Sequence, residues 1–172
     1  MEYLKKYIKE INDFPKPGIV FKDLNPLYRD PKIWNELMLP LKKLISRVKP
    51  DYIAGIESRG FISAASLAFN LSVGFIPIRK PNKLPGQVIG MDYKLEYGED
   101  RLEIQQNIIE KDSKIIIIDD LLATGGTAGA AGRLITEAGG SLIGYAFLVE
   151  LTELKGRKNL EYNLIVESLI KY

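Results

Sequence analysis

The side chains best suited to chemistry lie in one stretch, which reads KIIIIDDLLATGGT over residues 114–127. Its run of isoleucines predicts a buried strand, which would carry Asp119 and Asp120 to the carboxyl edge of a sheet, where open α/β folds bind ligands. Residues 123–127 would then open a helix, so that backbone N–H groups, hydroxyls and the helix dipole converge on one point. That point suits a phosphate monoester, and the two carboxylates suit hydroxyl groups beside it. Ribose 5-phosphate fits this description.

A purely structural interpretation of the same stretch is a strand end with solvated aspartates and a turn whose glycines serve only its geometry. We favour the phosphate site, because the carboxylates, the glycines, the hydroxyls and the helix start occur together. A nucleotide-binding P-loop fits poorly, since no Gly-Lys-Ser/Thr follows the glycines.

Composition restricts the chemistry further, because the 172 residues include neither cysteine nor histidine. Thiol nucleophiles, disulfides and zinc–thiolate sites are excluded, so proton transfer must use carboxylates, lysines, tyrosines or the substrate. The formal net charge is +2 and charges of both signs are interleaved, so no nucleic-acid partner is expected. The N-terminus, MEYLKKYIKEI, has no apolar signal core, and no later segment is apolar for the length of a bilayer. We therefore expect a soluble, cytoplasmic protein with no membrane partner.

The elements that must position this site are predicted from the spacing of apolar residues. Leu4, Ile8 and Ile11 recur at helical spacing and predict an N-terminal amphipathic helix. Asp30, which is followed by a proline, predicts the N-cap of a second helix. Pro40 lies inside that second helical pattern and should kink or split it.

From residue 52 onward, apolar runs alternate with helical patterns. Strands are expected at residues 52–56, 73–78, 114–118 and 142–149, and helices at 61–70 and 127–138. This alternation predicts an α/β fold with a central, mostly parallel sheet flanked by helices, in a single domain of residues 1–172. Residues 80–101 contain several prolines and glycines without a sustained helical period, which indicates a hairpin or a functional lid.

The strand, the two acidic residues and the Thr-Gly-Gly-Thr loop resemble the phosphoribosyl pyrophosphate (PRPP) motif of the type I phosphoribosyltransferases. Further segments are similar to the adenine phosphoribosyltransferases of that family, namely DFPKPGIVFKDLNPL, YIAGIESRGF, IRKPNKLPG, YKLEYGEDRLEIQ and LVELTELKGR. The resemblance implies the type I fold, with an N-terminal hood over about residues 1–30 and a flexible catalytic loop over about 80–101. It also implies transfer of the phosphoribosyl group of PRPP to adenine in purine salvage, which gives AMP and pyrophosphate.

The resemblance also implies roles for residues at the phosphate and base ends of the site. The 5-phosphate would be bound by Ala123, Thr124, Gly125, Gly126 and Thr127. Asp119 and Asp120 would hold the ribose hydroxyls. Adenine would be recognised by the backbone of Val20 and stacked on Phe21, a contact worth about 1–3 kcal/mol. Lys22 would contact the base or close the pocket, but it stands where many relatives carry arginine and lacks the planar fork of that residue.

The pyrophosphate and catalytic residues follow from the same resemblance. The pyrophosphate would be bound by Ser58, Arg59, Arg79 and Lys80. Three converging cations favour this role over isolated surface salt bridges. In the segment KLEYG, Glu96 is the predicted catalytic carboxylate with Tyr97 beside it, and Arg59 would assist by stabilising the leaving group.

The resemblance further implies a homodimer and Mg²⁺ bound with PRPP, held by PRPP oxygens and water rather than directly by the protein. Two alternatives stay open. A sister enzyme selective for hypoxanthine, guanine or xanthine would need a donor for the purine O6, which Lys22 could supply. A PRPP-sensing regulator would bind the ligand without turnover, although such proteins usually add a DNA-binding domain and a basic face.

Overall fold

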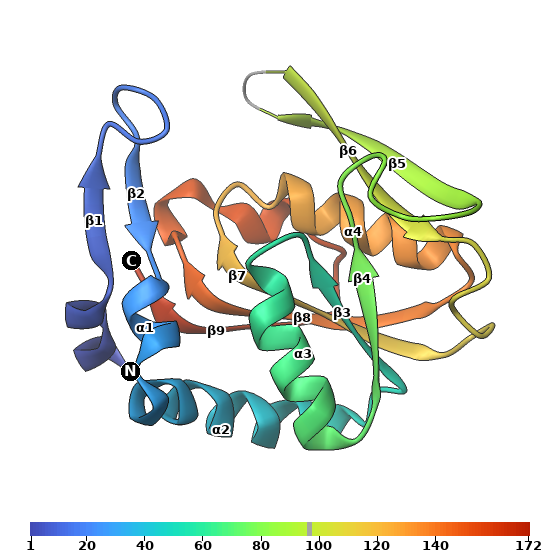
Figure 1. Ribbon diagram of the computed structural model, residues 1–172, viewed down its shortest axis with the longest axis horizontal. Helices are drawn as coiled ribbons and strands as arrows, with labels where there is room; N and C mark the ends of the chain where they lie inside the picture. Colours follow the sequence, from blue (N-terminus) through green and yellow to red (C-terminus); the bar gives the residue numbers. More distant parts are fainter. Residues whose placement is uncertain (96–97) are drawn as a thin grey trace.

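A five-stranded parallel sheet forms the centre of the molecule in the computed structural model, which describes residues 1–95 and 98–172 (Figure 1). Its strands lie in the order β4-β3-β7-β8-β9. Their bounds are β3 Tyr52–Ile56, β4 Gly74–Ile78, β7 Lys114–Leu122, β8 Ser141–Glu150 and β9 Ile165–Lys171. Residues 115–118 are fully buried, as expected for a strand covered on both faces. The predicted α/β class is confirmed, whereas the half-exposed edge strand β9 was not predicted.

Helices and a hairpin cover the two faces of this sheet. On one face lie α2 (Pro31–Val48) and α3 (Gly60–Leu71). On the other lie α4 (Gly126–Glu137) and the hairpin of β5 (Val88–Leu95) and β6 (Gly98–Gln105), which Figure 1 shows above the sheet. Each face has its own apolar core. The hairpin overlaps residues 80–101, where a hairpin or lid was predicted.

Helix α2 begins where the sequence predicts. The side chain of Asp30 accepts hydrogen bonds from two backbone N–H groups of the first turn (2.9 and 3.2 Å), and Pro31 is the first helical residue. The helix runs through Pro40 as one element, so the predicted split is wrong. Leu37 and Leu41, which are fully buried on either side of the proline, hold both halves against the core.

The N-terminal segment departs from the predicted helix. A 3-10 helix, η1, spans Glu2–Tyr7, and β1 (Lys9–Asn12) then pairs with β2 (Val20–Asp23) in an antiparallel ribbon. The prediction that Ile11 is helical is therefore wrong, because Ile11 pairs with Phe21 across this ribbon. A short helix is marginal by itself, so pairing with β2 outweighs the helical spacing of three apolar residues.

Strand β7 is longer than predicted, because it stays paired with β8 as far as Leu122 and Glu150. Asp119 and Asp120 thus lie within the strand instead of following it. Three short helical elements complete the described fold, namely α1 Asn25–Arg29, η2 Thr152–Leu154 and η3 Gly156–Asn159. None of the described helices combines the length and apolar character needed to cross a membrane.

Candidate functional site

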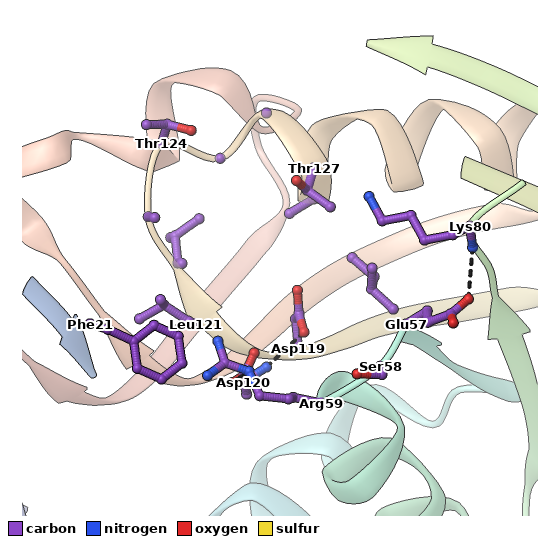
Figure 2. A pocket seen from close by; sticks show the side chains of 16 residues that line it. Phe21, Glu57, Ser58, Arg59, Lys80, Asp119, Asp120, Leu121, Thr124 and Thr127 are labelled. Carbon is purple, nitrogen blue, oxygen red and sulfur yellow. Dashed lines mark hydrogen bonds and ion pairs between the residues drawn. The ribbon is translucent and has the colours of Figure 1, made fainter. Parts of the chain in front are cut away.

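A cleft of about 420 Å³ lies where β3 and β7 end at the carboxyl edge of the sheet (Figure 2). It brings together most of the predicted site, namely Phe21, Ser58, Arg59, Lys80, Asp119, Asp120, Ala123, Thr124, Gly125, Gly126 and Thr127. In Figure 2, Phe21 lies toward one end of the cleft and Lys80 toward the other, with Asp119 and Asp120 between them. Residues assigned to the 5-phosphate, the ribose, the pyrophosphate and the base therefore border a single cavity.

The loop between β7 and α4 is held in shape by a later segment of the chain, η3. Gly125 has a φ of +82°, and a Cβ atom there would lie 2.1 Å from the carbonyl oxygen of Gly156. Gly156 is constrained in turn, because its own Cβ would lie 2.2 Å from the carbonyl oxygen of Ala123. The side-chain amide of Asn159 donates a hydrogen bond to the carbonyl oxygen of Thr124 (2.7 Å). These contacts place the N-terminus of α4 beside the cleft, an arrangement that binds phosphate.

The two aspartates lie close together at the end of β7. The backbone N–H of Asp120 donates to Asp119 Oδ1 (2.9 Å), and Arg59 Nε lies 2.7 Å from Asp120 Oδ2. Gly60 leaves room for this arrangement, since a Cβ atom there would lie 2.6 Å from Asp119 Oδ1. Burial, and then the charge of Asp120, raise the pKa of Asp119 well above its ordinary value. Burial also raises the pKa of Asp120, although Arg59 opposes that shift. Hydroxyl donors from a ligand would stabilise both carboxylates.

The three cations expected around pyrophosphate do not converge in the structure. Arg59 is directed toward Phe21, and its guanidinium carbon lies 5.0 Å from the centroid of the Phe21 ring. Arg79 does not line the cleft, because its Nε donates to Glu57 Oε2 (2.9 Å). A cation in a partly buried position is stabilised by a carboxylate or a ring, and both arginines find such partners. Of the three, Lys80 lines the cleft at the end away from Phe21.

Strand β2 directs the side chain of Phe21 into the cleft. The side chains of Val20 and Lys22 lie on the opposite side, because successive side chains of a strand alternate between its faces. Lys22 forms an ion pair with Glu10, and its Nζ lies 4.1 Å from the centroid of the Tyr172 ring. Val20 and Lys22 both line a separate cavity near the C-terminal residue. The structure thus places the Lys22 side chain away from the predicted base site, while recognition by the backbone of Val20 stays a prediction.

Some functional residues were missed, and two predicted ones cannot be placed. Glu96 and Tyr97 lie outside the described residues. Leu121 lines the cleft near Phe21 and gives that end of the cleft a second apolar wall (Figure 2). Neither Leu121 nor the support from Asn159 was predicted. The motif ending in Lys-Gly-Arg indicated only a family resemblance, and sequence spacing does not show which distant segments pack together.

Known proteins are similar to this chain over nearly its whole length. Residues 27–168 match the family model described as the phosphoribosyl transferase domain. The adenine phosphoribosyltransferase of Prochlorococcus marinus (strain NATL1A) is 78% identical over 172 residues, which cover 100% of both chains. The crystal structure of adenine phosphoribosyltransferase from Thermoanaerobacter pseudethanolicus is 46% identical, with a TM-score of 0.95 over 99% of this chain and 98% of the other. The Trypanosoma brucei enzyme, solved in complex with AMP, pyrophosphate and ribose-5-phosphate, is 27% identical, with a TM-score of 0.90 over 98% and 78%.

We expect Asp119→Asn to raise the midpoint of thermal unfolding at neutral pH by a few degrees. Folding raises the pKa of Asp119, so at neutral pH the charged carboxylate destabilises the folded state. At a pH below the ordinary pKa of aspartate, the carboxyl is neutral in the folded and the unfolded state, and this cost is absent. The gain should therefore shrink as the pH falls toward 4; about 1 kcal/mol corresponds to roughly 2–4 °C for a domain of this size. Circular dichroism melts at pH 7.5 and pH 4 measure this. A variant midpoint at or below that of the parent at pH 7.5 contradicts it.

Asn159→Ala is expected to weaken binding of ribose 5-phosphate by roughly two- to tenfold. A neutral hydrogen bond is worth about 0.5–1.5 kcal/mol, and its loss frees the loop carbonyl of Thr124. Calorimetric titration gives the Kd, with Asn35→Ala, at an exposed position of α2, as the matched control that should bind as the parent does. If Asn159→Ala binds as tightly as the parent, η3 does not support the phosphate loop.

Proposed function

This chain belongs to the adenine phosphoribosyltransferases, a family built on the phosphoribosyl transferase domain, and from that premise we propose how its cleft holds the reactants. The enzyme transfers the 5-phosphoribosyl group of PRPP to adenine, giving AMP and pyrophosphate. One observation carries the proposed arrangement: a helix N-terminus suited to phosphate and two adjacent carboxylates border the same cavity (Figure 2).

The 5-phosphate would bind the loop of residues 123–127, and the ribose hydroxyls would donate to Asp119 and Asp120. Hydroxyl donors favour the charged form of both carboxylates, whose pKa values are raised by burial. The transition state has oxocarbenium character, so negative charge beside the sugar stabilises it more than the ground state. The aspartates would therefore contribute to rate as well as to binding.

Adenine and pyrophosphate would occupy opposite ends of the cleft. The base would lie at the apolar end, against Phe21 and Leu121, and pyrophosphate would lie at the end bordered by Ser58 and Lys80. A displacement at C1 of the ribose needs the attacking nitrogen and the leaving oxygen on opposite sides of the carbon, held in line. The separation of the two ends in Figure 2 suits that requirement.

Arg59 and Arg79 would act through their neighbours. Arg59 packs over the aromatic ring at the base end, and its charge opposes the rise in the pKa of Asp120. Arg79 donates to Glu57 Oε2 (2.9 Å), and the same carboxylate oxygen accepts the backbone N–H of Lys80 (2.8 Å). Arg79 would thus position the main chain that carries Lys80, and Arg59 would position the ring and favour the charged form of Asp120.

Mg²⁺ is the cofactor that we propose, bound together with PRPP. Carboxylate oxygens of Asp119 and Asp120 border the cleft and are donors that this ion accepts. Within residues 1–95 and 98–172, no group of three or more His, Cys, Asp or Glu side chains could hold a metal ion by itself. The donors fit an ion that takes most of its ligands from PRPP and water, and that would neutralise charge on the departing pyrophosphate.

The catalytic loop, the domain boundaries and the assembly complete the proposal. Glu96 would accept a proton from adenine or hold its imidazole edge, with Tyr97 beside it. The chain would form one domain, with a hood of about residues 1–30 and a catalytic loop of about 80–101, and act in the cytoplasm. Leu39 on α2 and Phe69 on α3 are 64% and 86% exposed, an apolar surface that the second copy of a homodimer would cover.

The reaction itself is tested by AMP formation from PRPP, Mg²⁺ and adenine, run beside hypoxanthine, guanine and xanthine and a control without metal. We expect magnesium-dependent turnover with adenine alone, and severe loss of PRPP binding in the double variant Asp119→Asn, Asp120→Asn. Turnover confined to a 6-oxo purine would assign the chain to a sister specificity. PRPP binding without turnover would indicate a regulator, and normal turnover by the double variant would exclude ribose anchoring by the two aspartates.

Glu96→Ala should lower kcat by roughly 10²- to 10⁴-fold, the range for a positioned acid or base, while KM for both substrates changes much less. Steady-state kinetics at saturating Mg²⁺ measure both constants. Glu99→Ala, which removes an exposed glutamate of β6, is the matched control and should keep the parent kcat. An unchanged kcat in Glu96→Ala removes the catalytic assignment.

A further inference from the structure

The ammonium group of Lys80, which borders the cleft, is already bound to a carboxylate of the hairpin. Its Nζ forms an ion pair with Asp100 and lies 3.0 Å from the hydroxyl of Tyr93. The Tyr93 hydroxyl in turn donates to Asp100 Oδ2 (3.1 Å), and the backbone N–H of Arg101 donates to Asp100 Oδ1 (2.8 Å). The carboxylate is thus held in place by two further donors.

These groups come from the two strands of the hairpin and from the residues that follow β4. Lys80 follows β4, whereas Tyr93 on β5 and Asp100 on β6 are directly paired across the hairpin. The hydroxyl of Thr127, at the start of α4, lies 3.3 Å from the Tyr93 hydroxyl. The paired residues Tyr93 and Asp100 therefore contact Lys80, and Tyr93 also contacts the first turn of α4.

The environment favours the charged form of both partners. Partial burial would lower the pKa of Lys80, but the hydrogen bonds with Asp100 and Tyr93 outweigh it, so that this pKa is raised. Partial burial would raise the pKa of Asp100, but the hydrogen bonds from Lys80, the backbone N–H of Arg101 and Tyr93, together with the charge of Lys80, outweigh it, so that this pKa is lowered. An anion that approaches Lys80 therefore meets an ammonium whose charge is already balanced by a nearby carboxylate.

We propose that Asp100 competes with pyrophosphate for Lys80, and thereby weakens pyrophosphate binding and favours its release. This inference rests on the proposed role of Lys80 at the pyrophosphate end. The main chain of Lys80 is fixed, since its N–H donates to Glu57 Oε2 (2.8 Å), so the exchange of partners involves the flexible side chain. Asp100 is a positioning residue, because it acts through Lys80 and not on the reacting atoms.

The test is calorimetric titration of the full-length protein with inorganic pyrophosphate in the presence of Mg²⁺. Asp100→Asn keeps the size of the side chain and an acceptor for the N–H of Arg101, but removes the charge that holds Lys80. We expect pyrophosphate to bind roughly three- to tenfold more tightly, the range for a partly buried charge pair. Loss of a merely structural residue would weaken binding or leave it unchanged.

Asp92→Asn is the matched control, because it removes the same charge from the same hairpin. Asp92 pairs with Arg101 Nη1 (3.0 Å) and not with Lys80, so its variant should bind pyrophosphate within about twofold of the parent. Equal tightening in both variants would make the effect one of overall charge and overturn the proposal. Asp100→Ala is expected to act in the same direction as Asp100→Asn, and replaces it if the asparagine variant does not fold.

Lys80→Gln separates failure of this inference from failure of the proposed pyrophosphate site. We expect Lys80→Gln to weaken pyrophosphate binding, and the addition of Asp100→Asn to that variant to give no tightening. If Lys80→Gln binds pyrophosphate as the parent does, the role of Lys80 fails and the competition fails with it. If Lys80→Gln weakens binding but Asp100→Asn does not tighten it, only the competition is overturned.

Discussion

Two carboxylates at the end of the central strand are the constraint around which the site is organised. Burial opposes the charged form of both side chains, and their raised pKa values record that cost, to which the charge of Asp120 adds at Asp119. Neighbouring elements offset it: Arg59, just before α3, pairs with Asp120, and the dipole of α4 begins at the same edge of the sheet. A ligand that brings hydroxyl donors completes the compensation. The pair is therefore least favourable when the cleft is empty and gains most when the ribose is bound.

The loop that borders these carboxylates depends on residues some thirty positions further along the chain. Gly125 and Gly156 approach so closely that neither position has room for a Cβ atom. Arg157 anchors the supporting segment, since its Nε and Nη2 each lie 2.7 Å from an oxygen of Glu150 at the end of β8. A bidentate pair of this kind fixes direction as well as distance. The phosphate loop is thus connected to the sheet at both sides, through β7 before it and through β8 and η3 behind it.

Features that depend on local pattern could be predicted from the sequence, and features that depend on distant partners could not. Local sequence alone indicates the apolar runs of the inner strands, the helix start at Asp30 and the Gly-Gly turn. Ile11 was misassigned because its partner strand begins eight residues after β1 ends. Lys22 points away from the cleft because successive side chains of β2 lie on opposite faces of the strand. The sequence alone does not show which face of β2 lies toward the cleft. The assignment of Arg59 to pyrophosphate came from the family resemblance and stays a prediction, whereas the position of its side chain depends on Asp120, which is distant in sequence.

The cations near the cleft are matched by carboxylates, and this pairing has a consequence for turnover. Arg59 pairs within the aspartate site, Arg79 with Glu57 and Lys80 with Asp100. An anion that enters gains less attraction from matched cations than it would from free ones, because each pair must first be weakened. Tight binding of a highly charged product would slow its departure, and only interactions that strengthen in the transition state raise kcat. Mg²⁺ bound together with PRPP, as proposed, would supply positive charge during the transfer, and the matched cations of the protein would not retain pyrophosphate afterwards.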